Sequence, residues 1–162
     1  MPEAQTDLQC MEELLNEGDI AHIAFAGDEP YVIPINYTYA GGRMLFHCAF
    51  KGKKLDRIAA DPRVCIAVSS QDGHPSPHAG DICDNAFANV LCWGTASVIE
   101  DAEQRAGVLN DFQKPYATDE HPRDTFTAEQ AQNCGAVEVV VERMTGRQKS
   151  RGEKLAWSWT KE

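Results

Sequence analysis

The sequence has no long hydrophobic run and no basic leader. No window approaches the roughly 20 apolar residues that a membrane-spanning helix requires. Residues 1–15, MPEAQTDLQCMEELL, carry acidic residues where a signal peptide has basic ones. Internal repeats, heptad series and low-complexity tracts are also absent. We therefore expect a soluble globular protein of the cytoplasm, without a membrane partner.

Positive charge is scarce, and the cysteines are not spaced in pairs. The chain has 15 Lys and Arg against 25 Asp and Glu, which gives a formal net charge of -10. Such a surface repels a phosphate backbone, so nucleic acid is not an expected partner. None of the six cysteines forms a C-x-x-C pair. Without a secretory segment, free thiols are expected rather than a disulfide framework.

The hydrophobic pattern predicts one domain built mainly from strands. A chain of 162 residues with 43% hydrophobic content can bury one sizeable core, so we expect a single domain over residues 1–162. The spacing of apolar residues predicts helices at Asp7–Asn16 (in an N-terminal segment 1–17), Lys53–Ala60 and Asp101–Phe112. Runs rich in β-branched and aromatic residues predict strands at Ile20–Ala26, Tyr31–Tyr39, Arg43–Phe50, Arg63–Ser70, Asn89–Glu100 and Gly135–Met144.

Six or so antiparallel strands with a few peripheral helices favour a barrel, in which the first three strands are expected to be neighbours. Residues 114–124 fit no element. Residues 145–162 form a basic tail in this interpretation. Trp157 and Trp159, in LAWSW, alternate as they would in a strand, and they either anchor this tail or cover a neighbouring subunit.

Residues 71–86, QDGHPSPHAGDICDNA, form a long loop with two prolines and two glycines. A loop of this length in a compact domain is more often functional or mobile than incidental. Its side chains include possible ligands for zinc or iron, namely His74, His78, Asp81 and Cys83. The spacing matches no standard metal motif, and the prolines argue against a helix that would align the two histidines. We therefore expect no metal site.

Lys51, Lys53 and Lys54 crowd the first turn of a predicted helix. Free backbone N–H groups already make a helix N-terminus positive, so cations there are mildly unfavourable unless an anion neutralises both. A phosphate would do so, and Gly52 permits close backbone approach. The cluster lacks the full pattern of a P-loop, and solvated surface lysines without a ligand are the alternative interpretation.

The stretch YVIPINYTY, residues 31–39, is predicted to be a strand with one hydrophobic face and one partly polar face. Pro34 lies in its middle, and proline is largely confined to edge strands and bulges. Unpaired backbone groups beside it could meet the polar edge of a planar ligand. Together with the lysines, this strand favours a ligand with a phosphate at one end and a heteroaromatic ring at the other.

The sequence resembles the flavin-binding split β-barrels related to pyridoxamine 5'-phosphate oxidase, and among them the 5-nitroimidazole-resistance branch. The resemblance covers most of the chain. It is carried by Gly18-Asp19-Ile20-Ala21, Val32-Ile33-Pro34-Ile35-Asn36-Tyr37, Phe46-His47-Cys48-Ala49, Gly52-Lys53-Lys54-Leu55-Asp56, Pro62-Arg63-Val64-Cys65, Cys83 with Phe87-Ala88-Asn89-Val90 and Gly94, and Thr145-Gly146-Arg147. The chain departs from the family pattern at Phe87-Ala88-Asn89 and at Arg147, where a lysine is usual.

The resemblance implies a Greek-key split barrel that binds FMN at the interface of a homodimer. Backbone groups of Ile33, Pro34, Ile35 and Asn36 would face the edge of the flavin ring, and the next strand would line the cofactor with His47, Cys48 and Ala49. Lys51, Gly52, Lys53 and Lys54 would hold the phosphate. His47 is the candidate catalytic residue, as a general acid or a hydrogen-bond donor to the ring or the substrate.

The implied activity is that of an FMN-dependent oxidoreductase. It would take electrons from a nicotinamide nucleotide, NADH or NADPH, or from another donor, and reduce a small electrophile such as a nitroaromatic or a quinone. Two alternatives stay open from the sequence. The first is a non-catalytic flavin carrier or redox sensor, and the second is the same barrel with haem or a deazaflavin in place of FMN.

Overall fold

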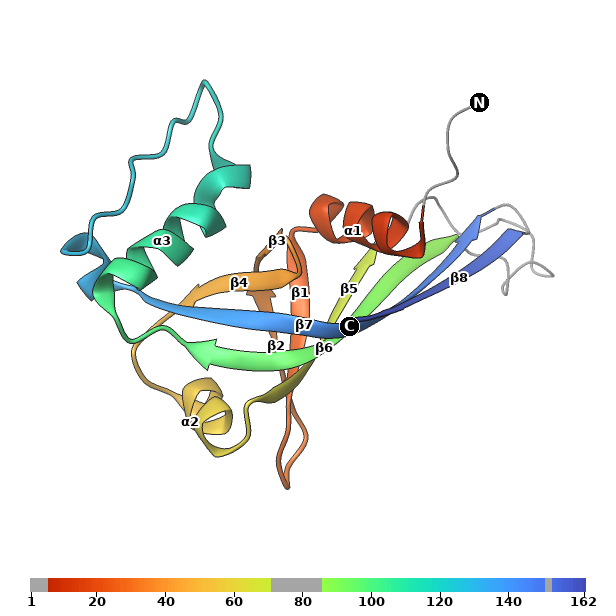
Figure 1. Cartoon of the computed structure of the whole chain (residues 1–162), viewed down its shortest axis with the longest axis horizontal. Coiled ribbons are helices and arrows are strands. Elements are labelled where there is room, and N and C mark those ends of the chain that lie inside the picture. Colours follow the sequence, from red (N-terminus) through yellow and green to blue (C-terminus); the bar gives the residue numbers. More distant parts are fainter. Residues whose placement is uncertain (1–5, 71–85, 151–152) are drawn as a thin grey trace, which may run out of the picture.

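A computed structural model of the chain describes residues 6–70, 86–150 and 153–162 (Figure 1). Its helices are α1 (Asp7–Glu17), α2 (Lys53–Ala60) and α3 (Ala102–Gln113), with short 3-10 turns η2 (Lys114–Tyr116) and η3 (Gln130–Asn133). Its strands are β1 (Ile20–Phe25), β2 (Tyr31–Asn36), β3 (Thr38–Ala40), β4 (Arg43–Cys48), β5 (Arg63–Ser70), β6 (Phe87–Val98), β7 (Gly135–Ser150) and β8 (Glu153–Thr160). No helix in the described part of the chain is long and apolar enough to cross a membrane.

All the described strands belong to one antiparallel sheet, which curls strongly (Figure 1). The strand order is β2-β1-β5-β6-β7-β4-β3, and β8 pairs with β7 beside this path. The helices lie around the outside of the sheet, with α2 on the connection between β4 and β5 and α3 on the connection between β6 and β7. The fold class expected from the sequence, a mainly β split barrel with peripheral helices, is confirmed.

The expected strand Tyr31–Tyr39 is wrong as one strand, because the run breaks at Tyr37. Its first half, β2, pairs with β1, and its second half, β3, pairs with β4. β2 and β3 therefore end the sheet order at opposite edges, although one residue separates them in the chain. The Tyr37 side chain is buried at the break, where its hydroxyl donates to the Leu15 carbonyl at 2.5 Å. The expectation that the first three strands are neighbours fails for the same reason.

The basic segment 145–162 is not a tail, and the end of the last strand expected at Met144 is wrong. β7 continues to Ser150, and β8 pairs with it in antiparallel register. Trp157 and Trp159 lie on one side of β8 and pack against the main core. The arginines in this part of β7 suggested a tail. Arg143 and Arg147 are exposed because their side chains lie on the outer face of the sheet, so they are compatible with a strand. The described residues thus form a sheet of eight strands rather than the six or so expected.

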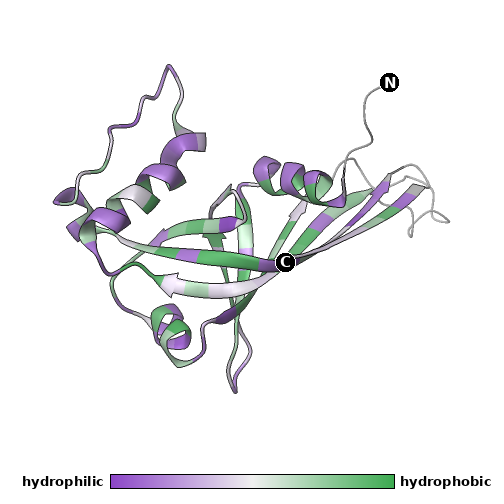
Figure 2. Cartoon of the chain, viewed as in Figure 1, coloured by the Kyte–Doolittle hydropathy of each residue, from purple (hydrophilic) through white to green (hydrophobic). Residues whose placement is uncertain are grey.

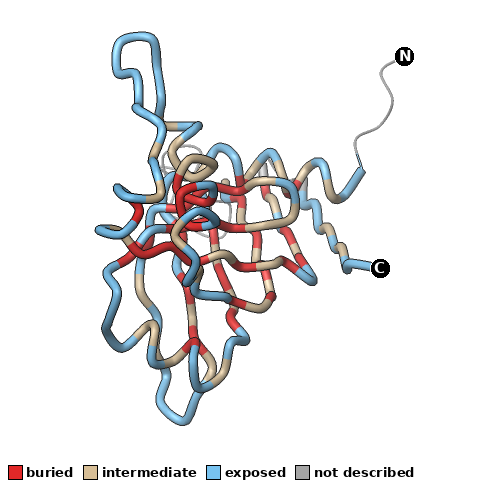
Figure 3. The backbone as a smooth tube through the Cα atoms, turned by 60° about the vertical axis from the view of Figure 1, so that its left-hand side comes forward, coloured by how far each residue is buried: buried red, intermediate tan, exposed pale blue. Residues whose placement is uncertain are grey.

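Alternation of side chains places the core on the inner face of the sheet. Along β5, Val64, Ile66 and Val68 are buried, while the residues between them are at least partly accessible. β6 repeats the pattern, so the two strands contribute one continuous inner surface. Figure 2 shows hydrophobic residues along the strands, and Figure 3 shows that the most exposed segments are peripheral loops. The bounds of α2 and β5 agree with those expected from the sequence.

Gly94 lies at the irregularity where β6 and β7 shift register. A Cβ atom there would lie 2.1 Å from the Val140 carbonyl oxygen, which is backbone and cannot rotate away. We expect Gly94→Ala to lower the free energy of unfolding by about 1 to 3 kcal/mol or more, measured by urea denaturation.

Gly107 on α3 supplies the matched control, because a Cβ atom there would have no neighbour within 4 Å. Gly107→Ala should raise the free energy of unfolding by about 0.5 to 1 kcal/mol, since alanine restricts the unfolded chain and favours the helix. Similar effects of the two substitutions would show that the register shift does not need a glycine.

Candidate functional site

β2 is an edge strand, as Pro34 predicted. Among the described strands it pairs only with β1, where Pro34 lies opposite His22. Along β2, Ile35 is buried and Ile33 half-buried, whereas Pro34 and Asn36 are exposed. An edge strand has backbone groups on one side without a ladder partner. This edge is therefore open to a ligand or to another chain.

Asn36 at the end of β2 and His47 near the end of β4 line one pocket of about 280 Å³. We call it the aromatic pocket, and its lining residues are Asn36, His47, Phe112, Gln113, Tyr116 and Arg123. The structure thus brings together two residues that the sequence analysis assigned to the flavin. It adds four residues that the sequence analysis did not select.

The aromatic pocket takes its name from two rings, one in the last turn of α3 and one in η2. Phe112 and Tyr116 have ring centroids 5.4 Å apart, and His47 meets the Phe112 ring edge-on at 5.1 Å. Thr38 Oγ1 donates to the Phe112 carbonyl at 2.6 Å, and Tyr116 Oη donates to the Tyr37 carbonyl at 2.8 Å. These bonds hold the rings against the break between β2 and β3. The four-residue spacing of the two aromatics at the end of a helical pattern was a usable signal for this contact.

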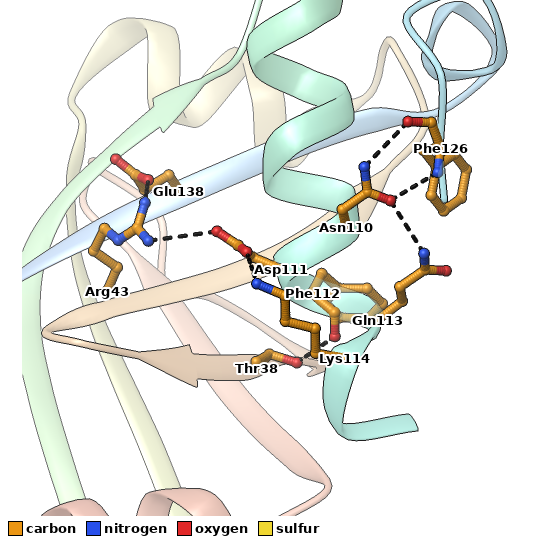
Figure 4. Close-up of polar contacts among 9 residues, drawn as sticks. All are labelled: Thr38, Arg43, Asn110, Asp111, Phe112, Gln113, Lys114, Phe126 and Glu138. Atoms are coloured by element: carbon orange, nitrogen blue, oxygen red, sulfur yellow. Dashed lines mark hydrogen bonds and ion pairs between the residues drawn. The ribbon is translucent and has the colours of Figure 1, made fainter. Parts of the chain in front are cut away.

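Two amide side chains of α3 hold the segment that follows Arg123, and Figure 4 shows the bonds between Asn110, Gln113 and Phe126. Asn110 donates to the Phe126 carbonyl at 3.1 Å and accepts from the Phe126 amide at 2.7 Å. Gln113 Nε2 donates to Asn110 Oδ1 at 3.1 Å and to the Asp124 carbonyl at 2.7 Å. The segment that follows Arg123 is therefore attached to the helix at both Asp124 and Phe126.

The lysines at the start of α2 do not act as one cluster. Lys53 Nζ lies 2.8 Å from Glu29 Oε2 and 4.7 Å from the centre of the Tyr31 ring, both near the β1–β2 turn. The hydrogen bond from Lys53 lowers the pKa of Glu29. Part of the negative charge expected beside these lysines thus comes from the chain itself. Among the described residues, Lys51 and Lys54 have no carboxylate partner.

The N-terminus of α2 is open. Gly52 is the N-cap with φ 129°, in the region that favours glycine, and no side chain in the described part of the chain caps the first turn. A Cβ atom on Gly52 would have nothing within 4 Å, so the backbone there is accessible. Lys51 and Lys53 are exposed and Lys54 is half-buried. The local geometry can therefore accept an anion at the backbone.

A buried arginine fixes the chain just before these residues. Arg105 on α3 donates to the carbonyls of Ile99, Glu100 and Ala131, and its guanidinium lies 5.0 Å from the centre of the Phe50 ring. Because the three carbonyls satisfy the charge, Arg105 can be only 8% exposed although no described carboxylate pairs with it. The loop between β4 and α2 is thereby tied to α3.

The cysteines near the site have structural environments. Burial raises the pKa of Cys48, and the ammonium of Lys54 opposes that rise. Burial also raises the pKa of Cys134, which follows η3. Both thiols are therefore protonated near neutral pH, and all five described cysteines are free. Cys83 and the possible metal ligands His74, His78 and Asp81 lie outside the described residues.

The profile of the pyridoxamine 5'-phosphate oxidase family matches residues 7–148. The chain belongs to this family. The match agrees with the resemblance carried by the motifs of β2, β4 and α2. A protein of Rhizobium meliloti (strain 1021), the uncharacterized protein RA0666, is 34% identical over 53 residues. That match spans 32% of this chain and only 34% of the relative.

Solved structures agree on the fold. A candidate 5-nitroimidazole antibiotic resistance protein from Bacteroides thetaiotaomicron VPI-5482 superposes with a TM-score of 0.70 at 21% identity, covering 93% of this chain and 84% of its own. The FAD and heme binding protein from Mycobacterium smegmatis has a TM-score of 0.72 at 17% identity, covering 97% of this chain and 83% of its own. At these identities the likeness shows a shared fold.

The Asn110 clamp can be tested by removing its side chain. Asn110→Ala leaves both backbone groups of Phe126 without their partner, so we expect the free energy of unfolding to fall by about 1 to 3 kcal/mol. Hydrogen exchange at the Phe126 amide should become faster. Gln104→Ala, at an exposed position on the same helix, should change neither quantity appreciably. Unchanged exchange at Phe126 in the Asn110 variant would contradict the clamp.

Proposed function

We propose that the protein binds FMN and acts as an oxidoreductase that reduces a small electrophile, nitroaromatic or quinone-like, with electrons from NADH or NADPH. One observation carries the proposal. The continuous stretch from His47 to Lys54 leads from a pocket lined by aromatic rings to an open helix N-terminus flanked by lysines. FMN would place its phosphate at this helix N-terminus and its ring along the open edge of β2, next to the pocket rather than inside it.

The residues present fit such a cofactor. At the phosphate end, Gly52 leaves the backbone accessible, and the free amides of the first turn of α2 and the ammonium of Lys54 favour a dianion. At the ring end, the open edge of β2 offers backbone groups beside Asn36. Ala49 and Lys51 lie between the ring end and the phosphate end of the proposed site. Both are exposed, so the middle of the cofactor could lie along this part of the chain.

Bound flavin would supply hydride or single-electron transfer, and the protein would supply position and protons. His47 is exposed and lines the aromatic pocket, so its imidazole can donate a proton or a hydrogen bond to a molecule held there. Phe112 and Tyr116 exclude water from one side of that molecule. Asn36 can hydrogen-bond at the border between the pocket and the edge of β2.

A homodimer is part of the proposal, because large apolar side chains flank the site. Val32 on β2 is 59% exposed, and Phe50 in the loop before α2 is 52% exposed. Both lie next to residues assigned to the flavin. A second copy of the chain would cover them together with the open edge of β2, and so close the flavin site from outside.

A second candidate keeps the fold and changes the ligand. The structural likeness to a protein that binds FAD and heme favours this alternative. A protein that carries such a cofactor without turnover is also consistent with the fold. Mass spectrometry of the small molecule released on denaturation separates FMN from FAD, haem and a deazaflavin.

The phosphate assignment predicts the effect of removing two lysines. Lys53→Ala combined with Lys54→Ala should weaken FMN binding by about 30- to 1,000-fold, because each of the two lost charge-assisted contacts contributes about 1 to 2 kcal/mol. Fluorescence titration of FMN measures the dissociation constant. The control removes Lys114 and Lys161, which lie outside the stretch from His47 to Lys54, and should bind FMN as the parent does. Equal FMN affinity in the two double variants would contradict the assignment of Lys53 and Lys54 to the phosphate.

The catalytic proposal predicts colour changes under anaerobic conditions. The FMN-loaded protein should bleach with NADH or NADPH and recolour with a nitroaromatic compound. His47→Gln should keep FMN but slow the recolouring by about 10²-fold, as expected for loss of a general acid. Stopped-flow absorbance measures both steps. Protein that stays yellow with either nucleotide would favour the carrier, and an unchanged rate in the variant would remove His47 from the chemistry.

A further inference from the structure

We propose that the aromatic pocket is a substrate site selective for planar aromatic carboxylates, and that Arg123 is the residue that confers this selectivity. The inference deepens the proposed function, and it rests on that function for the role of the flavin beside His47. It concerns Arg123, Phe112 and Tyr116, which the motifs of the flavin site do not include.

The first argument is charge. The lining of the aromatic pocket contains one guanidinium and no carboxylate, in a chain with a formal net charge of -10. Two other pockets, which share the β3 residues Thr38 and Tyr39, differ in this respect, since one includes Asp19 and the other Asp111. Among the described residues no carboxylate pairs with Arg123, which is exposed. A guanidinium in this position is available for a carboxylate, which it can bind in a bidentate manner.

Acidic groups nearby do not cancel this charge. Asp19 is close enough to Tyr116 to contribute to the raised pKa of its phenol, although burial is the larger cause. It is not among the residues that line the aromatic pocket, although its own pocket shares Tyr116 with it. Asp124 follows Arg123 in the chain, but forms no ion pair with it within the described residues. Arg123 is therefore the only charged side chain among the described residues that line the aromatic pocket.

The second argument is shape. Phe112 and Tyr116 are tilted by 36° to each other, and the His47 ring stands at 78° to Phe112. The Tyr116 hydroxyl and the Phe112 carbonyl are already bonded to the protein, so both residues offer mainly apolar ring surface. The volume of about 280 Å³ lies near the lower end of small-molecule sites, about 300 Å³. One substituted ring suits this space.

The third argument is preorganisation. The backbone next to Arg123 is held through the Asp124 carbonyl by Gln113, and Asn110 holds Phe126 on both sides (Figure 4). The rings opposite are held by Thr38 and by the Tyr37 carbonyl. A ligand therefore meets walls that are already in place, which lowers the entropy lost on binding.

The test compares two ligands of nearly the same shape, 4-nitrobenzoate and its neutral counterpart 4-nitrobenzamide. Isothermal titration calorimetry on the purified full chain, with flavin content read from absorbance, should show about tenfold tighter binding of the acid. Arg123→Gln should remove this preference by weakening the acid alone. Arg123→Lys, which keeps the charge but not the bidentate geometry, should restore part of it.

Lys114→Gln is the matched control, because it removes one positive charge from the same region but lies outside the aromatic pocket. It should leave the preference unchanged. The inference is overturned if the parent binds both compounds equally or not at all, or if the control loses the preference as Arg123→Gln does. It is also overturned if Arg123→Gln raises the KM for NADPH and leaves nitrobenzoate binding intact, since the pocket would then serve the donor.

The two proposals can fail separately. An Arg123-dependent preference for the acid in protein that binds no flavin would uphold the pocket and overturn the proposed function. Protein that binds FMN through Lys53 and Lys54 but shows no preference for 4-nitrobenzoate would support the proposed flavin site and overturn the assignment of the aromatic pocket.

Discussion

The break in the sheet at Tyr37 is the constraint on which the rest of the site depends. β2 and β3 are separated by this one residue, and each pairs with a different part of the sheet. The buried hydroxyl of Tyr37 binds α1 through Leu15, and its carbonyl accepts from Tyr116. Thr38, the next residue, holds the end of α3 through the Phe112 carbonyl. Two residues thus attach two helices to the opening of the barrel.

The aromatic pocket follows from this arrangement. Asn36 precedes the break, and β4, which carries His47, pairs with β3 just after it. Because α3 is bonded at Thr38, its last turn places Phe112 against His47. The residues of the aromatic pocket come from positions 36, 47 and 112–123 of the chain, and they meet where the sheet does not close.

Local sequence patterns were enough for the parts of the fold that local forces decide. The helix α2 and the strand β5 have the predicted bounds, because a clear apolar face and a clear β-branched run define them. Motifs in β2 and β4 also indicated Asn36 and His47, which the structure places in one pocket. The family followed from the same motifs.

Long-range contacts set the limits of the prediction. The run Tyr31–Tyr39 is continuous in hydropathy, and only the pairing of its two halves with different strands reveals the break. Arg123 lies in a segment without regular structure, and its position depends on hydrogen bonds from Asn110 and Gln113 to its neighbours. No periodicity in the sequence encodes such bonds. The extension of β7 was missed because its exposed arginines resemble those of a disordered tail.

The acidic turn between β1 and β2 gives the lysines at α2 two roles. Glu29 binds Lys53 and also lies 3.3 Å from Arg57 Nη2, while Asp28 binds Arg57 at 2.9 Å. A phosphate at the N-terminus of α2 therefore competes with Glu29 for Lys53, whereas Lys54 has no such competitor among the described residues. All these groups except Arg57 are largely exposed, so the competing ion pair is weak and screened by salt. If the proposed phosphate site is correct, Lys54 and the free amides of α2 would contribute most of the affinity for the anion, and Lys53 would have to leave Glu29 to contact it.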